Sequence, residues 1–157
     1  MDIQPCGCLP FKVYPKEGDR LVLCPAYVFP IEVFERGLMT RVKYLFQTVV
    51  VNAYDGRAEL VDEKCVDPDC DFSVEAFAAE CLDVKISADI AAEIAKYDAV
   101  PKDSRGWRKI MLSRNVAVCE DRVKLVWRVY LVRNSEAVDT FTGDVIKSAG
   151  LLGMLFS

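Results

Sequence analysis

Two pairs of closely spaced cysteines are the side chains in this sequence best suited to chemistry. Cys6 and Cys8 are separated by one residue near the start of the chain, and Cys65 and Cys70 are separated by four. Together the four thiolates would complete a tetrahedral zinc site. Neither pair has the usual gap of two residues, so we expect plain free thiols and no cofactor. A disulfide and a zinc site are the alternative interpretations.

The absence of histidine argues against catalysis. It removes the commonest general base and the commonest zinc ligand other than cysteine. The chain has seven cysteines and no secretory signal, which predicts buried thiols in a reducing, cytoplasmic environment. A cysteine nucleophile would therefore depend on a lysine or a helix N-terminus for activation. We expect the protein not to be an enzyme.

Charge is distributed unevenly along the chain. Residues 52–100 carry 13 acids and 4 bases, whereas residues 101–133 carry 9 bases and 3 acids. The two blocks are expected to face each other, within the fold or across a homodimer. The alternative is that the basic 102–133 segment binds a polyanion, a small ligand or an acidic protein. No RNA-binding signature accompanies it, and we expect no nucleic-acid partner. The basic candidates are Arg105, Arg108, Lys109 and Arg114.

Four aromatic residues on predicted strands are candidates for lining a ligand cleft, although strand aromatics are more often part of the core. They are Tyr27, Phe29, Trp127 and Tyr130. Around the last two, apolar residues alternate with polar ones, which predicts that Arg128 and Tyr130 lie on a solvated sheet face.

The elements that would position these residues are strands at both ends of the chain and helices between them. Pro25 and Pro30 predict that the first strand lies at a sheet edge or is bulged. Apolar residues at helical spacing predict helices over 73–82 and from Ser87 to before Pro101, and residues 107–111 fit either a helix or a strand. Strands are expected over 21–34, 42–51, 57–61, 116–118, 123–132 and 136–139.

This order predicts an α+β fold, with two or three helices on one face of an antiparallel sheet. We expect a single domain over residues 1–157. Its parts are an N-terminal arm (1–20), a first hairpin unit (21–62), a helical segment (71–100), a second hairpin unit (116–147) and an apolar tail (148–157). The tail is shorter than the roughly 20 residues that span a bilayer, so membrane attachment is expected only if the C-terminus is truncated.

The two hairpin units close with similar sequences. Val51-Asn52-Ala53-Tyr54-Asp55-Gly56 in the first corresponds to Val138-Asp139-Thr140-Phe141-Thr142-Gly143 in the second. In each, Asn or Asp caps its own backbone and Gly adopts a φ that other residues resist. This closing motif resembles that of the PepSY domain. The resemblance implies a helix packed on an antiparallel sheet, a role in binding or restraining another protein, and no catalytic residues.

The function expected from the sequence is therefore that of a non-enzymatic interaction or regulatory module. Its partner is another protein or a second copy of the same chain. A partner strand that extends an exposed sheet edge is one way in which such a module binds.

Overall fold

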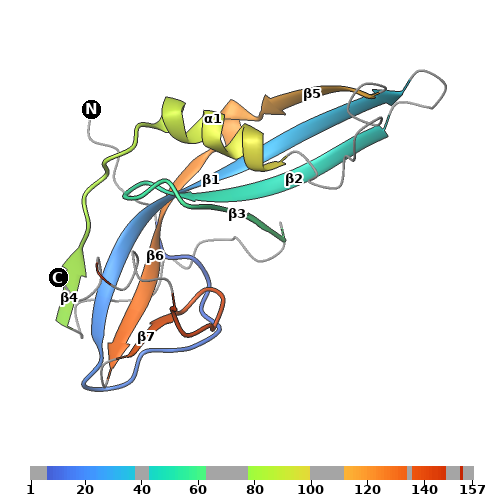
Figure 1. Ribbon diagram of the computed structural model, residues 1–157. Helices are drawn as coiled ribbons and strands as arrows, with labels where there is room; N and C mark the ends of the chain where they lie inside the picture. The colour runs from blue at the N-terminus through green and yellow to red at the C-terminus, as the bar shows by residue number, and fades with distance from the viewer. Residues whose placement is uncertain are drawn as a thin grey trace.

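The computed structural model describes residues 7–37, 43–62, 78–99, 112–133, 136–147 and 153. In this part of the chain a mostly antiparallel, seven-stranded sheet curls into a half-barrel, and one α-helix packs on it (Figure 1). The fold is α+β in the broad sense. Its elements are β1 (Arg20–Gly37), β2 (Lys43–Asn52), β3 (Ala58–Val61), β4 (Ala78–Cys81), α1 (Ala88–Ala99), β5 (Leu112–Val118), a 3-10 turn (Glu120–Arg122), β6 (Lys124–Arg133) and β7 (Glu136–Asp139).

Strand β1 is the centre of the sheet, so the expected edge position is wrong. β2 pairs along one side of β1, β6 and then β5 pair along the other, and β4 runs parallel to its start. Both prolines lie where a neighbouring strand ends. The Pro25 carbonyl accepts from Ala53 N, just beyond β2, at 2.7 Å, and the Pro30 carbonyl accepts from Cys119 N, between β5 and β6, at 2.9 Å. At such gaps no ladder bond needs the missing N–H.

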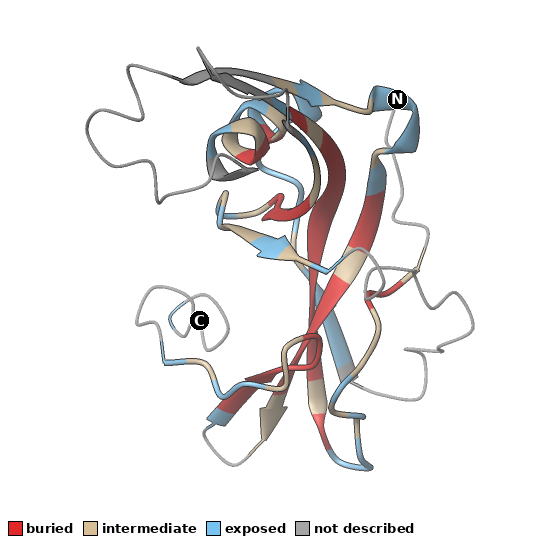
Figure 2. Ribbon diagram, turned by 90° about the vertical axis from the view of Figure 1, so that its right-hand side faces the viewer, coloured by how far each residue is buried: buried red, intermediate tan, exposed pale blue. Residues whose placement is uncertain are grey.

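One face of the sheet is covered by α1. Ala91 and Ala95 of the helix pack against residues of β1 and β2, among them Tyr27, Phe29 and Val49. Buried residues run along the middle of the long strands beneath the helix (Figure 2). Burial of this apolar face accounts for much of the stability of the sheet.

Of the predicted helices, the one after Ser87 is confirmed. The Ser87 hydroxyl oxygen accepts from Ile90 N at 3.4 Å, and Asp89 lies in the first turn, where negative charge is favoured. The helix predicted over 73–82 is wrong at its end, because Ala78–Cys81 forms β4 and pairs with β1. Residues 71–77 and 107–111 lie outside the described residues. Within the described part there is one α-helix instead of two or three.

The remaining strand predictions agree with the structure in position. The structure extends the predicted 116–118 strand back to Leu112, and it places β3 and β7 at the two ends of the order β3-β2-β1-β6-β7. No helix in the described part of the chain is both long and apolar enough to cross a bilayer.

Candidate binding site between two turns

The turns after β2 and after β7 have the same backbone geometry. In the first, Gly56 N donates to Asn52 O at 2.9 Å and Asn52 N donates to Arg57 O at 2.8 Å. In the second, Gly143 N donates to Asp139 O at 2.8 Å, and the Asp139 N–H bonds to the carbonyl of the residue after the glycine at 3.0 Å. The φ angles of the glycines are 78° and 81°. Each turn therefore ends in a bulge that requires glycine.

The strands that carry these turns correspond in the same way. β1 and β6 pair over nine positions, and the middle pair is Cys24 opposite Arg128. Two residues beyond this pair, Ala26 of β1 lies opposite Asn52, and Tyr130 of β6 lies opposite Asp139. The two hairpins are thus related by an approximate two-fold axis through the Cys24–Arg128 pair. The side chains of Asn52 and Asp139, opposite Ala26 and Tyr130, lie on the same face of the sheet as this pair.

A third correspondence involves the segments that precede the two hairpins. Leu9 N donates to Trp127 O at 2.8 Å, and Leu82 N donates to Leu23 O at 2.9 Å. Further along, residues 12 and 13 donate to Thr140 O, and residues 85 and 86 donate to Ala53 O. Each segment therefore binds the hairpin that belongs to the other half of the chain.

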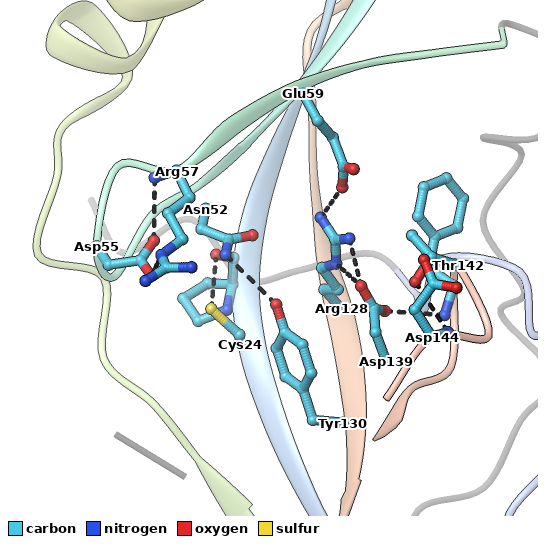
Figure 3. Close-up of polar contacts among 12 residues, drawn as sticks. Cys24, Asn52, Asp55, Arg57, Glu59, Arg128, Tyr130, Asp139, Thr142 and Asp144 are labelled. Atoms are coloured by element: carbon cyan, nitrogen blue, oxygen red, sulfur yellow. Dashed lines mark hydrogen bonds and ion pairs between the residues drawn. The ribbon is translucent and has the colours of Figure 1, made fainter. Parts of the chain in front are cut away.

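Arg128 is the centre of a buried polar network in this region (Figure 3). The residue is 6% exposed. Its Nε donates to Asp139 Oδ2 at 3.1 Å, Nη2 bonds to the same oxygen, and Nη1 forms an ion pair with Glu59 Oε1. The prediction that Arg128 and Tyr130 face solvent is wrong, because Tyr130 is also buried.

The ion pair between Glu59 and Arg128 depends on the curl of the sheet. Glu59 is on β3 and Arg128 is on β6, with β2 and β1 between them in the sheet order. On a flat sheet three strand spacings would separate their backbones by about 14 Å. Curling brings β3 over β6, so that one carboxylate from each hairpin neutralises the same guanidinium.

The side chains at the first position of the two turns differ in their bonding. Asp139 Oδ1 accepts from Phe141 N at 3.0 Å, and its other oxygen accepts from Arg128. Asn52 is 2% exposed, and its Nδ2 donates to Tyr130 Oη at 3.4 Å. Asn52 Oδ1 is buried and has no hydrogen-bond partner in the described part of the protein.

A pocket of about 230 Å³ opens between the two turns. Figure 3 shows the Asn52 amide oxygen turned towards the side on which Arg128 and Glu59 lie. The pocket combines buried amide and hydroxyl groups with charged groups that are paired with one another. Its lining residues are Asn52, Arg57, Ala58, Glu59, Arg128, Tyr130 and Asp139.

Burial and neighbouring charges together set the protonation of the titratable groups here. Burial opposes the charge of Arg128, but Tyr130, Asp139 and Glu59 outweigh it and raise the pKa of the guanidinium. Burial also raises the pKa of the Tyr130 hydroxyl, and it raises the pKa of Cys24 to about 12. At neutral pH Arg128 is charged while Cys24 is an uncharged thiol, which is a poor nucleophile.

A second pocket, of about 550 Å³, lies beside β3 and shares Glu59 with the first. Its apolar part comes from both halves of the chain and includes Phe11, Val61 and Phe141. β3 pairs only with β2 among the described strands. Because Asn52 N bonds to Arg57 O and antiparallel bonding alternates, the N–H and C=O groups of Ala58 and Leu60 point away from β2. No backbone hydrogen bond joins those two residues to another described segment.

The structure separates the four aromatic candidates. Tyr27 and Phe29 are buried beneath α1, and the Tyr27 hydroxyl donates to Ile86 O at 3.1 Å. Trp127 packs on the same sheet face, against the N-terminal arm. Tyr130 alone lines the pocket between the turns.

The structure describes few of the other candidates. Cys8 is buried within the N-terminal arm and forms an isolated β-bridge with Trp127, whereas Cys6, Cys65 and Cys70 lie outside the described residues. No cluster of potential metal ligands occurs within the described ranges. Arg105, Arg108 and Lys109 also lie outside them. Arg114 is in β5, opposite Glu35 of β1.

Sequence reasoning missed Arg128, Asn52, Asp139 and Glu59 as parts of one site. One signal for the arrangement is present in the sequence. Cys8-Leu9-Pro10-Phe11-Lys12-Val13 and Cys81-Leu82-Asp83-Val84-Lys85-Ile86 share the pattern Cys-Leu-x-apolar-Lys-apolar, and they are the two segments that bind the opposite hairpins. Comparing the residues upstream of the two turn motifs would have revealed it.

Comparisons with protein-family models, with curated proteins and with solved structures find no match to this chain.

Proposed function

We propose that the protein is a non-enzymatic interaction module that binds an extended segment of another protein along the edge of β3 that no other described strand covers. The observation that carries this proposal is the outward-facing backbone of Ala58 and Leu60 beside the 550 Å³ pocket. These residues offer two N–H donors and two C=O acceptors to an added strand, which is how a sheet edge commonly recognises a peptide.

The surroundings of β3 suit such a segment. Side chains of an added strand alternate between the two faces of the sheet. Those on the face of Glu59 and Val61 would enter the two pockets, where Phe11 and Phe141 offer apolar contact. Leu60 is 49% exposed and extends the contact on the opposite face.

We also propose that the chain consists of two related hairpin units, each preceded by a Cys-Leu-x-apolar-Lys-apolar segment. The matched turns, the ladder centred on Cys24 and Arg128, and the exchange of the two leading segments support this duplication. It agrees with the resemblance to PepSY domains, whose role is to bind other proteins. Paired charges at Arg128 and an un-ionised Cys24 fit binding better than catalysis.

The experiment that tests the proposal uses random peptides displayed on phage and selected against the full chain. Leu60→Pro removes the outward N–H of residue 60 but no bond of the β2–β3 ladder, because a proline with its nitrogen facing outward is tolerated at a sheet edge. Leu60→Ala is the matched control, which shortens the side chain and keeps the N–H. We expect selected peptides to bind Leu60→Pro at least about tenfold more weakly than Leu60→Ala, the size of one lost hydrogen bond.

Amide exchange provides an independent readout. Bound peptide should protect the amides of Ala58 and Leu60, which face outward, while leaving the already bonded amide of Glu59 unchanged. Equal binding to both variants, or protection confined to other strands, would contradict the proposed β3 site.

A further inference from the structure

The orphaned oxygen of Asn52 needs an explanation. A buried acceptor without a hydrogen bond destabilises the folded state, so native proteins rarely retain one unless a ligand or a water binds to it. Asn52 Oδ1 is such an acceptor, on a residue that is 2% exposed and lines the 230 Å³ pocket.

The second turn shows that the backbone geometry of these turns does not force the side-chain oxygen to remain without a partner. At the corresponding position Asp139 Oδ1 caps its own turn by accepting from Phe141 N. The equivalent bond, from Tyr54 N to Asn52 Oδ1, is absent, although the backbone bonds of the two turns match. The first turn therefore forms without its cap. The oxygen stays buried and without a partner, on a side chain that lines the pocket and on the side on which Arg128 and Glu59 lie.

The remaining polar groups define the charge of a ligand. The three guanidinium nitrogens of Arg128 are engaged by Asp139 and Glu59, and Arg57 is paired with Asp55. A carboxylate would therefore meet cations that are already paired, together with the like charges of Asp139 and Glu59. An ammonium group would lie beside Arg128 and Arg57. An uncharged ligand avoids both repulsions.

The hydrogen-bonding groups define its shape. Asn52 Oδ1 needs a donor, and the hydroxyl of Tyr130, which accepts from Asn52 Nδ2, still has its own proton to donate. We propose that the pocket between the two turns binds a primary carboxamide, whose NH₂ donates to Asn52 and whose carbonyl oxygen accepts from Tyr130. A carboxamide carries the required donor and acceptor on one planar group.

The size of the pocket permits more than a single solvent molecule. Its volume of about 230 Å³ is several times the roughly 30 Å³ that one water occupies in the liquid. The carboxamide has two possible sources. It belongs either to an asparagine or glutamine side chain of the segment that binds along β3, or to a free small amide. The first source rests on the proposed function, and the second does not.

The test is a titration of the isotope-labelled full chain, followed by NMR, with three probes of similar size: propionamide, propionate and propylammonium. The side-chain NH₂ signal of Asn52 is identified by its loss in Asn52→Asp. We expect propionamide to cause saturable shifts of this signal and of the backbone amides of Ala58 and Glu59. The other two probes should leave them unchanged. No saturable shift with propionamide, or equal shifts with all three probes, would overturn the proposal.

Two variants test the assigned roles. Tyr130→Phe removes the proposed donor and should weaken propionamide binding about tenfold, as for one lost hydrogen bond. Tyr44→Phe is the matched control, because Tyr44 is half exposed, bonds to Glu32 and does not line the pocket. Equal affinity in these two variants would refute the role of Tyr130. Asn52→Asp adds a negative charge and should reverse the preference, so that propylammonium binds more tightly than propionamide.

Peptides selected on β3 distinguish the two sources. If the partner supplies the carboxamide, replacing its asparagine or glutamine by aspartate or glutamate should weaken binding. Leu60→Pro should weaken peptide binding as above and leave propionamide binding intact. Insensitivity to that replacement, together with saturable binding of free glutamine, would assign the site to a free amide. Peptide binding without any response to propionamide would remove this inference and leave the β3 proposal in place.

Discussion

The two turns of this protein have one backbone geometry and two uses. After β7, both carboxylate oxygens of Asp139 are engaged, one by the turn and one by Arg128. After β2, the amide oxygen of Asn52 is engaged by neither. A difference of one side-chain group at matched positions therefore separates a turn that completes the structure from a turn that leaves a buried acceptor for a ligand.

The two residues at the centre of the β1–β6 ladder also differ in their use, although their backbone positions match. Cys24 and Arg128 are directly opposite each other and occupy corresponding positions in the two hairpins. Cys24 is an uncharged, fully buried thiol. Arg128 is charged and gains a carboxylate from each hairpin, Asp139 from its own and Glu59 from the other. Arg128 thus connects the two halves of the sheet across the pocket.

Substitution of Arg128 in this central pair should give the largest effect, and substitution of Cys24 is the matched comparison. Arg128→Met leaves the carboxylate of Asp139 buried without its cation, and breaking a buried pair in this way costs about 3–5 kcal/mol. Cys24→Ala removes one sulfur atom from an apolar cluster and should cost about 1 kcal/mol, as an average core truncation does. Urea unfolding at neutral pH measures both values.

A double variant identifies the cause of the larger loss. Asp139→Asn introduced into Arg128→Met removes the uncompensated charge, so it should restore part of the stability instead of adding a second loss. If Arg128→Met costs no more than Cys24→Ala, the network at Arg128 does not hold the two hairpins together.

The glycines of the two turns provide the next comparison. Both have positive φ, so alanine at either position should cost about 1 kcal/mol from backbone strain alone. At Gly56 an added Cβ would lie 2.9 Å from Ile86 Cδ1, whereas at Gly143 the nearest atom is Lys12 Cβ at 3.6 Å. Gly56→Ala should therefore be the more destabilising, by about a further 1 kcal/mol if the isoleucine has to shift. Thermal unfolding of the two variants at the same pH measures this difference, and equal midpoints would refute it.

The sequence predicted those parts of the fold that depend on neighbouring residues. The two turns were identifiable because Asx residues and a glycine with positive φ form a local motif. α1 was identifiable from its apolar spacing after Ser87. The pattern at residues 78–81 also suited a helix, but these residues form β4, because pairing with the start of β1 overrides a local preference.

The candidate site depended on information that local patterns do not contain. Alternation along β6 placed Arg128 on the face opposite Trp127 correctly, but it gave no sign that β3 curls over that face and buries it. The prolines of β1 favour an edge position in the sequence, because the gaps between neighbouring strands that accommodate them exist only in the three-dimensional structure. Asn52 was identifiable from the sequence as a turn residue. That its side-chain oxygen has no hydrogen-bond partner, whereas that of Asp139 has one, depends on the three-dimensional structure.

The two ends of the β1–β6 ladder provide the smallest contrast, and it depends on pH. At one end Asp19 accepts from Arg133 at 3.0 and 2.6 Å and from Lys16 N at 2.7 Å, and the bond to Arg133 is the largest cause of its lowered pKa. The approximate two-fold axis relates Asp19 to Val123 and Arg133 to Phe29. At this other end of the ladder both residues pack in the cluster beneath α1.

The ion pair at Asp19 should make stability depend on pH. A carboxyl whose pKa is lower in the folded state stabilises the protein above its unfolded pKa of about 3.9, and that contribution disappears as the pH falls through the folded pKa. Asp19→Asn should therefore cost about 1 kcal/mol at pH 7 and progressively less below pH 4. Val123→Ala should lower the free energy of unfolding by the same amount at pH 7 and below pH 4. Urea unfolding at a series of pH values measures both, and a loss for Asp19→Asn that does not change with pH would show that the charge of Asp19 contributes nothing at this end of the ladder.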